Sequence, residues 1–302
     1  MPTGGAGLTP ATIAALLERD WGITATAVVP HGRGMNSQTW LVEADGLRLV
    51  AKAVPADRRA SFEAGLETAT LVEAAGIPAG APVPTRAGRP TATAESSVLA
   101  LLRFVDGSDL TGATESERRL IGSTLGRVHV ALAGQVVPAA DRFHWLDDAA
   151  PQLSLRPWLR GSIDGALRAW DSIEPASLTW GLLHTDPAPE AFRFDGTTGE
   201  CGLIDWDLGM TGPRLYDLAS AQMYVGGPAN SGPLIDAYLA TGALPADEVD
   251  RGLDTLARMR WAVQADYFAR RVTDDDVTGI DDPADNEDGL EDARRALAAY
   301  AR

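Results

Sequence analysis

Two aspartates, Asp186 and Asp205, constrain this chain more than any other feature of its sequence. Asp186 follows His184 by two residues in a proline-containing, loop-like segment, and Asp205 ends the next apolar, strand-like run. In phosphoryl transfer, one such carboxylate accepts the proton of the attacking hydroxyl, and the other holds the magnesium ion on the nucleotide phosphates. The pair therefore predicts a chain that folds around a site for phosphoryl transfer.

The expected secondary structure divides the chain into a sheet-rich beginning and a helix-rich remainder. Runs rich in β-formers predict strands at 25–29, 39–43, 47–54 and 98–105. The dipeptide Asp45-Gly46 predicts a hairpin, and a helical pattern covers 59–75. Later helical patterns occupy 115–132, 153–173, 214–224, 233–240, 246–272 and 288–301. We therefore expect an α+β protein of two lobes, an N-terminal lobe over 1–103 and a C-terminal lobe over 104–302.

The composition narrows the class of partner. The chain has 26 basic and 42 acidic residues, a formal net charge of -16. This charge opposes binding to nucleic acid and to anionic membranes, which both need a basic surface, and suits a cationic small molecule or simple solubility. Cys201 is the single cysteine, so a disulfide within the chain is excluded. No apolar run is long enough to span a bilayer, so a cytoplasmic protein is expected.

A segment of small residues lies between the first two expected strands. It contains Gly32, Gly34, Asn36 and Ser37. Glycines let a backbone approach phosphate groups, and small polar side chains can donate hydrogen bonds to their oxygens. The same composition is also typical of a simple hairpin turn. The segment is therefore a candidate nucleotide-binding loop, and the next strands of the chain decide between the two interpretations.

The strand over 47–54 carries Lys52 among apolar neighbours. A lysine at this place can reach the α- and β-phosphates of a nucleotide if a carboxylate fixes its position. The next helix offers two candidates, Glu63 and Glu67. Glu67 fits better, because Leu71 and Ala74 continue its face of the helix.

Together these segments resemble the aminoglycoside phosphotransferase and choline-kinase-like family over roughly residues 20–225. The resemblance is carried by Gly32–Ser37, Ala51-Lys52, Gly76-Ile77-Pro78, Leu125–His129, His184-Thr185-Asp186, Leu203–Asp207 and Gly212–Ala219. It implies a bilobal protein-kinase-like fold with a small antiparallel-sheet N-lobe and a larger, mainly helical C-lobe. It also implies ATP or GTP and Mg²⁺ as cofactors.

The family's catalytic loop usually reads His-Gly-Asp-Leu-His-Pro-Gly-Asn, and Pro189 sets the register here. The resemblance then implies that Asp186 is the catalytic base and that Asp205 binds the metal. The position of the family's metal-binding Asn is Ala191. Glu190 and Asp207 are further candidate metal ligands, although Asp207 could equally face solvent.

The resemblance implies an ATP-dependent O-phosphotransferase acting on a small hydroxylated molecule, with a cationic, aminoglycoside- or antibiotic-like compound as one candidate. Ala191 keeps an alternative open, a kinase-fold protein that binds nucleotide or ligand with weak or no turnover. We expect His129 and His184 to be structural, and Asp217 to hold the helix that follows it.

Overall fold

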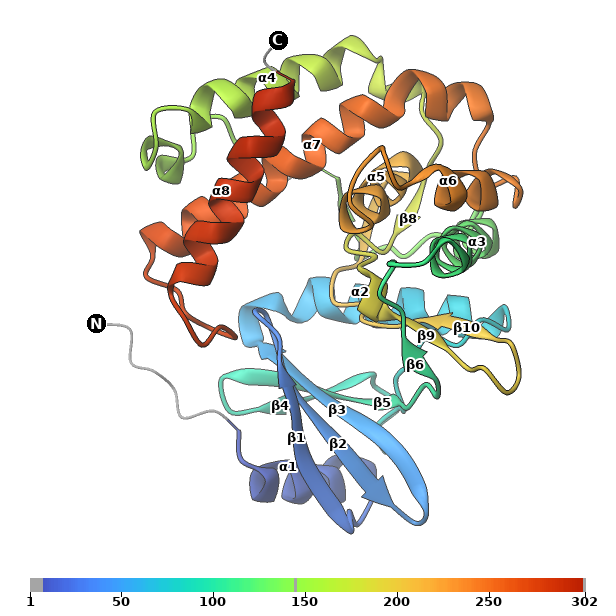
Figure 1. The fold of residues 1–302 in the computed structure, drawn as a ribbon. Helices are drawn as coiled ribbons and strands as arrows, with labels where there is room; N and C mark the ends of the chain where they lie inside the picture. Colours follow the sequence, from blue (N-terminus) through green and yellow to red (C-terminus); the bar gives the residue numbers. More distant parts are fainter. Residues whose placement is uncertain (1–7, 144–145, 301–302) are drawn as a thin grey trace. The chain divides into compact units, whose positions relative to one another are not determined.

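The computed structural model describes residues 8–143 and 146–300, the side chains at 32 and 33 excepted (Figure 1). Its described residues form two compact units. The first contains the residues up to Ser108 together with Val137–Asp141 and Arg193–Gly209, and the second contains the remainder. The first unit therefore extends past the lobe expected over 1–103 and includes Asp205. Asp186 belongs to the second unit.

A five-stranded antiparallel sheet forms the centre of the first unit (Figure 1). Its strands, in spatial order, are β1 (Ala27–Arg33), β2 (Gln38–Ala44), β3 (Leu47–Pro55), β5 (Ser97–Arg103) and β4 (Thr91–Ala94). The expected hairpin at Asp45-Gly46 is confirmed, because both residues have positive φ angles, 50° and 76°, as a tight two-residue turn requires. The sequence did not predict β4, which is short and rich in threonine and alanine.

Apolar side chains project from both faces of this sheet, and a helix covers each face. Helix α1 (Pro10–Leu16) and the π-helical turn Leu17–Trp21 share a core with Trp40, Val42, Leu49 and Ala51. Helix α2 (Arg59–Ala74) packs through Phe62 and Leu66 on Val54, Val98 and Ala100. Because side chains alternate along a strand, Lys52 belongs to the same face as Val54. The lysine therefore points toward the side of the sheet that α2 covers.

Helix α2 also touches the segment that follows β10 (Cys201–Leu203). A Cβ atom added to Gly65 would lie 2.3 Å from the backbone oxygen of Trp206. The backbone N–H of Gly209 donates to the Ser61 oxygen at 2.9 Å. Glycine at 65 thus permits a direct contact between the helix and the backbone of residues 206–209, which places Asp205 and Asp207 beside α2.

Six helices of the described chain make up most of the second unit. They are α3 (Glu115–Ala131), α4 (Leu159–Ser172), α5 (Arg214–Tyr224), α6 (Gly232–Leu239), α7 (Ala246–Thr273) and α8 (Ala284–Ala299). Helix α3 begins with a capping box between Thr114 and Glu117. Helix α7 packs against α4, α5 and α8, and its apolar face joins Leu159, Ile163 and Leu290 in one core. This packing makes α7 the central helix of the unit.

Short strands precede and follow the loop that contains Asp186 along the chain. Strand β8 (Trp180–Leu183) pairs antiparallel with β11 (Met210–Pro213), in a sheet of order β7-β11-β8. The remaining strands are β6 (Ser108–Asp109), β7 (Asp141–Arg142) and β9 (Phe192–Phe194). Short 3₁₀ turns occupy Ala56–Arg58, Pro151–Ser154, Pro175–Ser177 and Pro189–Ala191. The helix expected over 153–173 therefore begins later, at Leu159, after a 3₁₀ turn and Pro157.

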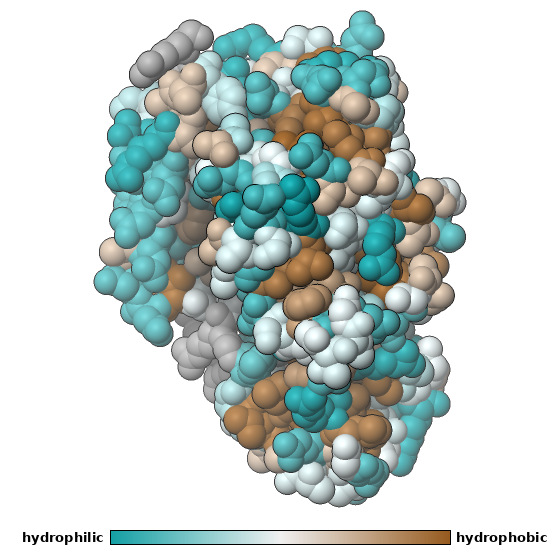
Figure 2. Space-filling model, turned by 45° about the vertical axis from the view of Figure 1, so that its right-hand side comes forward, coloured by the Kyte–Doolittle hydropathy of each residue, from teal (hydrophilic) through white to brown (hydrophobic). Residues whose placement is uncertain are grey.

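Within the described part of the chain, no helix is long and apolar enough to cross a membrane. On the face drawn in Figure 2, hydrophilic residues separate the hydrophobic ones into patches. The large hydrophobic side chains that are exposed are few and scattered along the sequence: Val29, Leu47, Val130, Val136 and Val277.

The contact at Gly65 predicts an unusual response to alanine. Alanine is a better helix former than glycine by about 1 kcal/mol, yet Gly65→Ala should lower the free energy of unfolding by about 1–3 kcal/mol, because the new methyl group meets backbone. Gly161→Ala in α4 is the matched control, since nothing lies within 4 Å of its added Cβ. In urea unfolding, Gly161→Ala should be at least as stable as the wild type. If Gly65→Ala were as stable as Gly161→Ala, the contact at Gly65 would be contradicted.

Candidate functional site

The Gly-rich segment forms the turn between β1 and β2. Gly32 lies in β1, and Gly34, Asn36 and Ser37 lie in the turn itself. Thr39 of β2 pairs with Lys52 of β3, so Ser37 is two residues, or about 7 Å, along the strand from the row of Lys52. The structure therefore brings this turn near the lysine. Its binding of phosphate stays a prediction.

Lys52 is buried and makes ion pairs with two carboxylates. Its Nζ atom contacts Oδ1 of both Asp205 and Asp207. Burial opposes the charged form, but the two carboxylates outweigh it and raise the pKa of Lys52 well above its usual range. The lysine is therefore a fixed positive charge on the α2 face of the sheet.

The two carboxylates differ in their surroundings. The Asp205 side chain is 56% exposed, whereas that of Asp207 is 25% exposed. Burial and the nearby charge of Asp205 raise the pKa of Asp207 to about 7, although Lys52 acts in the opposite direction. Asp205 has a positive φ of 75°, which is uncommon for a residue with a side chain. Such strain is often found at functional sites.

These carboxylates have the chemistry of a magnesium site. Mg²⁺ prefers oxygen ligands, keeps several waters, and is often bound through one or two carboxylates together with substrate phosphates. The Oδ1 atoms of Asp205 and Asp207 converge on one point, now taken by the Lys52 ammonium. Among the described residues, no group of three or more His, Cys, Asp or Glu side chains could hold a metal ion. A site here would therefore rely on water and phosphate for its other ligands.

The expected pairing of Lys52 with Glu67 is not observed. Glu67 is exposed on α2, and Glu63 instead bonds to Arg59 and Thr91. The physical reason is the rotation of α2 about its axis. The helix turns its Gly65 face to residues 206–209. Glu63 and Glu67 lie two positions before and after Gly65, so they point in other directions. Asp205 and Asp207 supply the carboxylates that hold Lys52.

A buried aspartate of α5 anchors the loop before Asp186. Asp217 is fully buried and accepts hydrogen bonds from the backbone N–H groups of His184 at 2.7 Å and Thr185 at 2.8 Å. His129 contacts the same carboxylate at 3.0 Å, which confirms its structural role. Asp217 lies in α5, so these bonds join that helix to the loop before Asp186. Thr185 has a positive φ of 77°, so this anchoring coincides with a strained backbone.

The Asp186 side chain is 61% exposed and is held by two residues that no sequence motif indicated. Its Oδ1 atom accepts hydrogen bonds from the Tyr224 hydroxyl at 2.5 Å and from Arg260 Nη2 at 3.1 Å. Arg260 Nη2 also donates to the Tyr224 oxygen at 3.0 Å. Burial raises the pKa of Tyr224 well above its usual range, so the phenol stays a hydrogen-bond donor. One signal was present in the sequence, an arginine on the apolar stripe formed by Leu253 and Leu256.

Residues 189–191 form a 3₁₀ turn after Asp186. Ala191 is buried and has no side-chain oxygen, so it cannot replace the family's Asn as a metal ligand. Glu190 is exposed and lies in the second unit. Its role as a metal ligand, like that of Asp207, stays a prediction.

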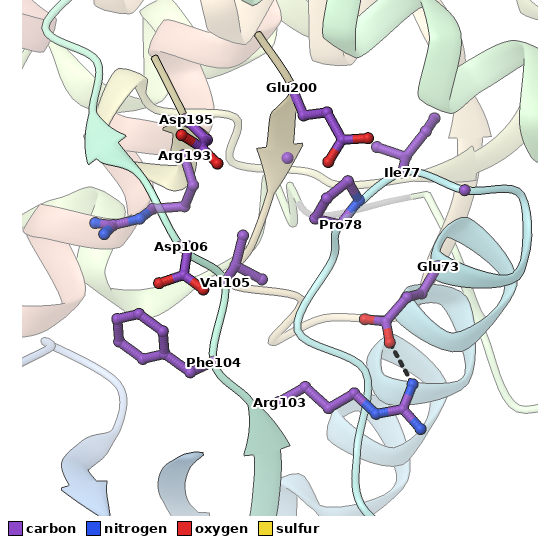
Figure 3. A pocket seen from close by; sticks show the side chains of 12 residues that line it. Glu73, Ile77, Pro78, Arg103, Phe104, Val105, Asp106, Arg193, Asp195 and Glu200 are labelled. Atoms are coloured by element: carbon purple, nitrogen blue, oxygen red, sulfur yellow. Dashed lines mark hydrogen bonds and ion pairs between the residues drawn. The ribbon is translucent and has the colours of Figure 1, made fainter. Parts of the chain in front are cut away.

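The first unit contains a cavity of about 420 Å³ that includes none of the candidate phosphate-binding, metal-binding or catalytic residues (Figure 3). It lies among the end of α2, residues 103–106 and the β9–β10 hairpin, and the Glu73–Arg103 ion pair is part of its wall. Carboxylates and arginines both line it. Lys52 does not line it.

A family model described as the phosphotransferase enzyme family matches residues 27–261. The chain belongs to this family. The match includes Lys52, Asp186, Asp205 and Arg260, although it assigns no role to any of them.

Two proteins are related to this phosphotransferase in sequence. An uncharacterized protein of Deinococcus radiodurans is 27% identical over 252 residues, 77% of this chain and 73% of that protein. A homoserine kinase of Rhodospirillum rubrum is 30% identical over 152 residues, 47% of this chain. That alignment spans 46% of the homoserine kinase, about half its length.

Solved structures establish the fold. A microcompartment-associated aminopropanol kinase has a TM-score of 0.72 at 18% identity, with 95% of each chain covered. The amicoumacin kinase hAmiN, in complex with AMP-PNP, Ca²⁺ and Ami, has a TM-score of 0.71 at 15% identity and covers 95% of this chain and 92% of its own. The α+β, protein-kinase-like fold expected from the sequence is therefore confirmed.

The raised pKa of Asp207 predicts how stability depends on pH in metal-free buffer. Between its ordinary value of 3.8 and about 7, the folded protein keeps a proton that the unfolded chain has lost. The contribution of Asp207 to the free energy of unfolding should therefore fall as pH rises through this window. Asp207→Asn should flatten that part of the profile in urea unfolding at several pH values with EDTA. An unchanged profile would show that Asp207 titrates normally.

The anchoring role of Asp217 predicts a large loss of stability. Asp217→Ala removes one buried carboxylate and leaves the His184 and Thr185 N–H groups without their acceptor. We expect the free energy of unfolding to fall by about 2–4 kcal/mol. Asp236→Ala, at an exposed position of α6, is the control and should change stability by less than about 0.5 kcal/mol. Similar free energies of unfolding for the two variants in urea would contradict the anchoring role of Asp217.

Proposed function

We propose that this chain is an ATP-dependent O-phosphotransferase that acts on a small hydroxylated molecule. The observation that carries the proposal is the buried Lys52 held between Asp205 and Asp207. A lysine and metal-binding carboxylates at one point are what a nucleotide triphosphate requires, since its phosphates carry several negative charges.

In the proposed site, Lys52 binds the α- and β-phosphates, and the backbone of the turn at 34–37 covers them. Asp205 and Asp207 would hold Mg²⁺, which neutralises phosphate charge when it is bound. The backbone of Leu101–Phe104 is the proposed contact of the adenine ring. With phosphate and metal bound, Lys52 would share its charge between these carboxylates and the phosphate oxygens.

Asp186 is the proposed catalytic base. Its exposed carboxylate accepts the proton of the substrate hydroxyl as the hydroxyl oxygen forms a bond to the γ-phosphorus. The bond between the γ-phosphorus and the bridging oxygen breaks, and ADP leaves with that oxygen. Positioning and charge neutralisation provide most of the rate enhancement in such a reaction.

We infer that the substrate is an amino alcohol or a larger amine that carries a hydroxyl group. The names of related proteins support this class, since homoserine and aminopropanol each combine an amine with a hydroxyl. The net charge of -16 also favours a cationic substrate over an anionic one. GTP is an alternative donor, because its triphosphate carries the same charges as that of ATP.

Ala191 favours a second candidate function, a nucleotide-binding protein with little or no turnover. Its buried methyl group supplies no oxygen to a metal ion, whereas the family's loop supplies one from Asn. A water molecule can take that ligand position, because Mg²⁺ keeps several waters in most sites. The phosphotransferase is therefore the main proposal, and a measurement of turnover distinguishes it from a nucleotide-binding protein.

Turnover over a panel of substrates tests the proposal. Purified protein with ATP or GTP and Mg²⁺ or Mn²⁺ should release nucleoside diphosphate in the presence of homoserine, aminopropanol, choline or an aminoglycoside. Asp186→Asn should lower kcat at least ~100-fold with nucleotide binding retained. Asp236→Asn is the matched control on an exposed helix position and should behave as wild type.

Nucleotide binding separates the two candidate functions. Lys52→Met keeps an apolar stem at the buried position and should lose most of the thermal stabilisation that ATP and Mg²⁺ give to the wild type. Lys52-dependent binding without turnover of any substrate would favour the nucleotide-binding protein. If nucleotide stabilised the wild type and Lys52→Met equally, the nucleotide site at Lys52 would be contradicted for both candidate functions.

A further inference from the structure

One oxygen of the Asp186 carboxylate is engaged and the other is open. Oδ1 receives both hydrogen bonds, from Tyr224 at 2.5 Å and from Arg260 at 3.1 Å. No described residue donates to Oδ2, and the side chain is 61% exposed. A carboxylate is planar, so two hydrogen bonds that hold Oδ1 also set the direction of Oδ2.

The two donors are themselves firmly held. The Arg260 side chain is 10% exposed, and its helix, α7, is central to the second unit. Its guanidinium also lies over the Tyr224 ring, 5.5 Å from the centroid. Helix α5, which carries Tyr224, packs directly against α7. Arg260, Tyr224 and Asp186 therefore form a closed triangle of hydrogen bonds supported by two packed helices.

Charge explains why this arrangement is stable. A buried guanidinium needs a carboxylate close by, because an uncompensated buried charge is costly. Among the described residues, Asp186 is the only carboxylate paired with Arg260. The need of the arginine for a counter-charge thus keeps Asp186 in place, even though the aspartate itself faces solvent.

The loop around Asp186 offers no comparable support from its own side chains. Asp217 fixes only the backbone of His184 and Thr185. Ala191 has no polar side-chain atom to donate or accept. The direction of the Asp186 carboxylate therefore depends on α5 and α7.

We propose that Arg260 and Tyr224 are positioning residues that hold Oδ1 of Asp186, so that Oδ2 is presented to the hydroxyl of the substrate. This inference rests on the proposed phosphotransferase function. It goes beyond that function because it assigns the orientation of the Asp186 carboxylate to α5 and α7, which lie far from Asp186 in sequence.

A double-mutant cycle tests the pairing without any assay of activity. Asp186→Asn and Arg260→Gln each change the melting temperature, and the double variant should lose clearly less than the sum of the two single losses, because the two residues act on each other. Additive losses would overturn the proposal. Since the cycle needs no substrate, it gives a result even if no turnover is found.

Kinetics test the positioning role itself. Arg260→Gln should lower kcat by about 10- to 100-fold, the effect of a misplaced reacting group, while KM for ATP stays within about twofold. Arg260→Lys should recover part of kcat, since an ammonium can still donate to Oδ1. Tyr224→Phe should lower kcat less, because Arg260 remains. Unchanged kcat in Arg260→Gln would overturn the proposal.

Arg270→Gln is the matched control. Arg270 lies on the same helix, is 54% exposed and pairs with Asp266 at 3.0 Å, so the variant removes the same charge and an ion pair without contacting Asp186. It should keep the wild-type kcat. A kcat as low as that of Arg260→Gln would assign the effect to the charge of α7 and overturn the positioning role. Absence of turnover in the wild type, with a coupled cycle, would instead refute the proposed function and leave the pairing intact.

Discussion

A lysine on the inner face of a small sheet can be buried only if carboxylates accompany it. Lys52 meets this condition through Asp205 and Asp207, which lie after a strand far along the chain. The direct contact between Gly65 of α2 and the backbone of Trp206 places these carboxylates beside the lysine. The alternation of β3, the packing of α2 and the strained backbone at Asp205 all serve this one charge cluster. The nucleotide site proposed here is built on that cluster.

The parts of the site that depend on local sequence could be predicted. The Asp-Gly hairpin, the strand that carries Lys52 and the aspartates at 186 and 205 each leave a signal within a few residues. The rotation of α2 could not be predicted, because it depends on a contact between Gly65 and a segment distant in sequence. Glu67 was expected beside Lys52 for this reason, since helix periodicity alone does not show which face meets which partner.

The surroundings of Asp186 were harder to predict still. Asp217 was expected to hold its helix, but the sequence did not show that its partner is the backbone of His184 and Thr185. Arg260 and Tyr224 come from two helices, and no short motif connects them with the loop. An arginine on an apolar helix stripe is a usable signal, because a buried charge requires a partner. Sequence alone does not identify that partner.

Phosphorus NMR of the wild-type protein with ATP, Mg²⁺ and an amino alcohol would detect phosphoryl transfer itself, because it follows the transferred group. We expect the γ-phosphate signal of ATP to be replaced by that of a phosphomonoester of the alcohol, together with the signals of ADP. We expect no such signal when Asp186 is replaced by Asn. Unchanged ATP with every alcohol, or release of inorganic phosphate alone, would contradict the proposed phosphotransferase.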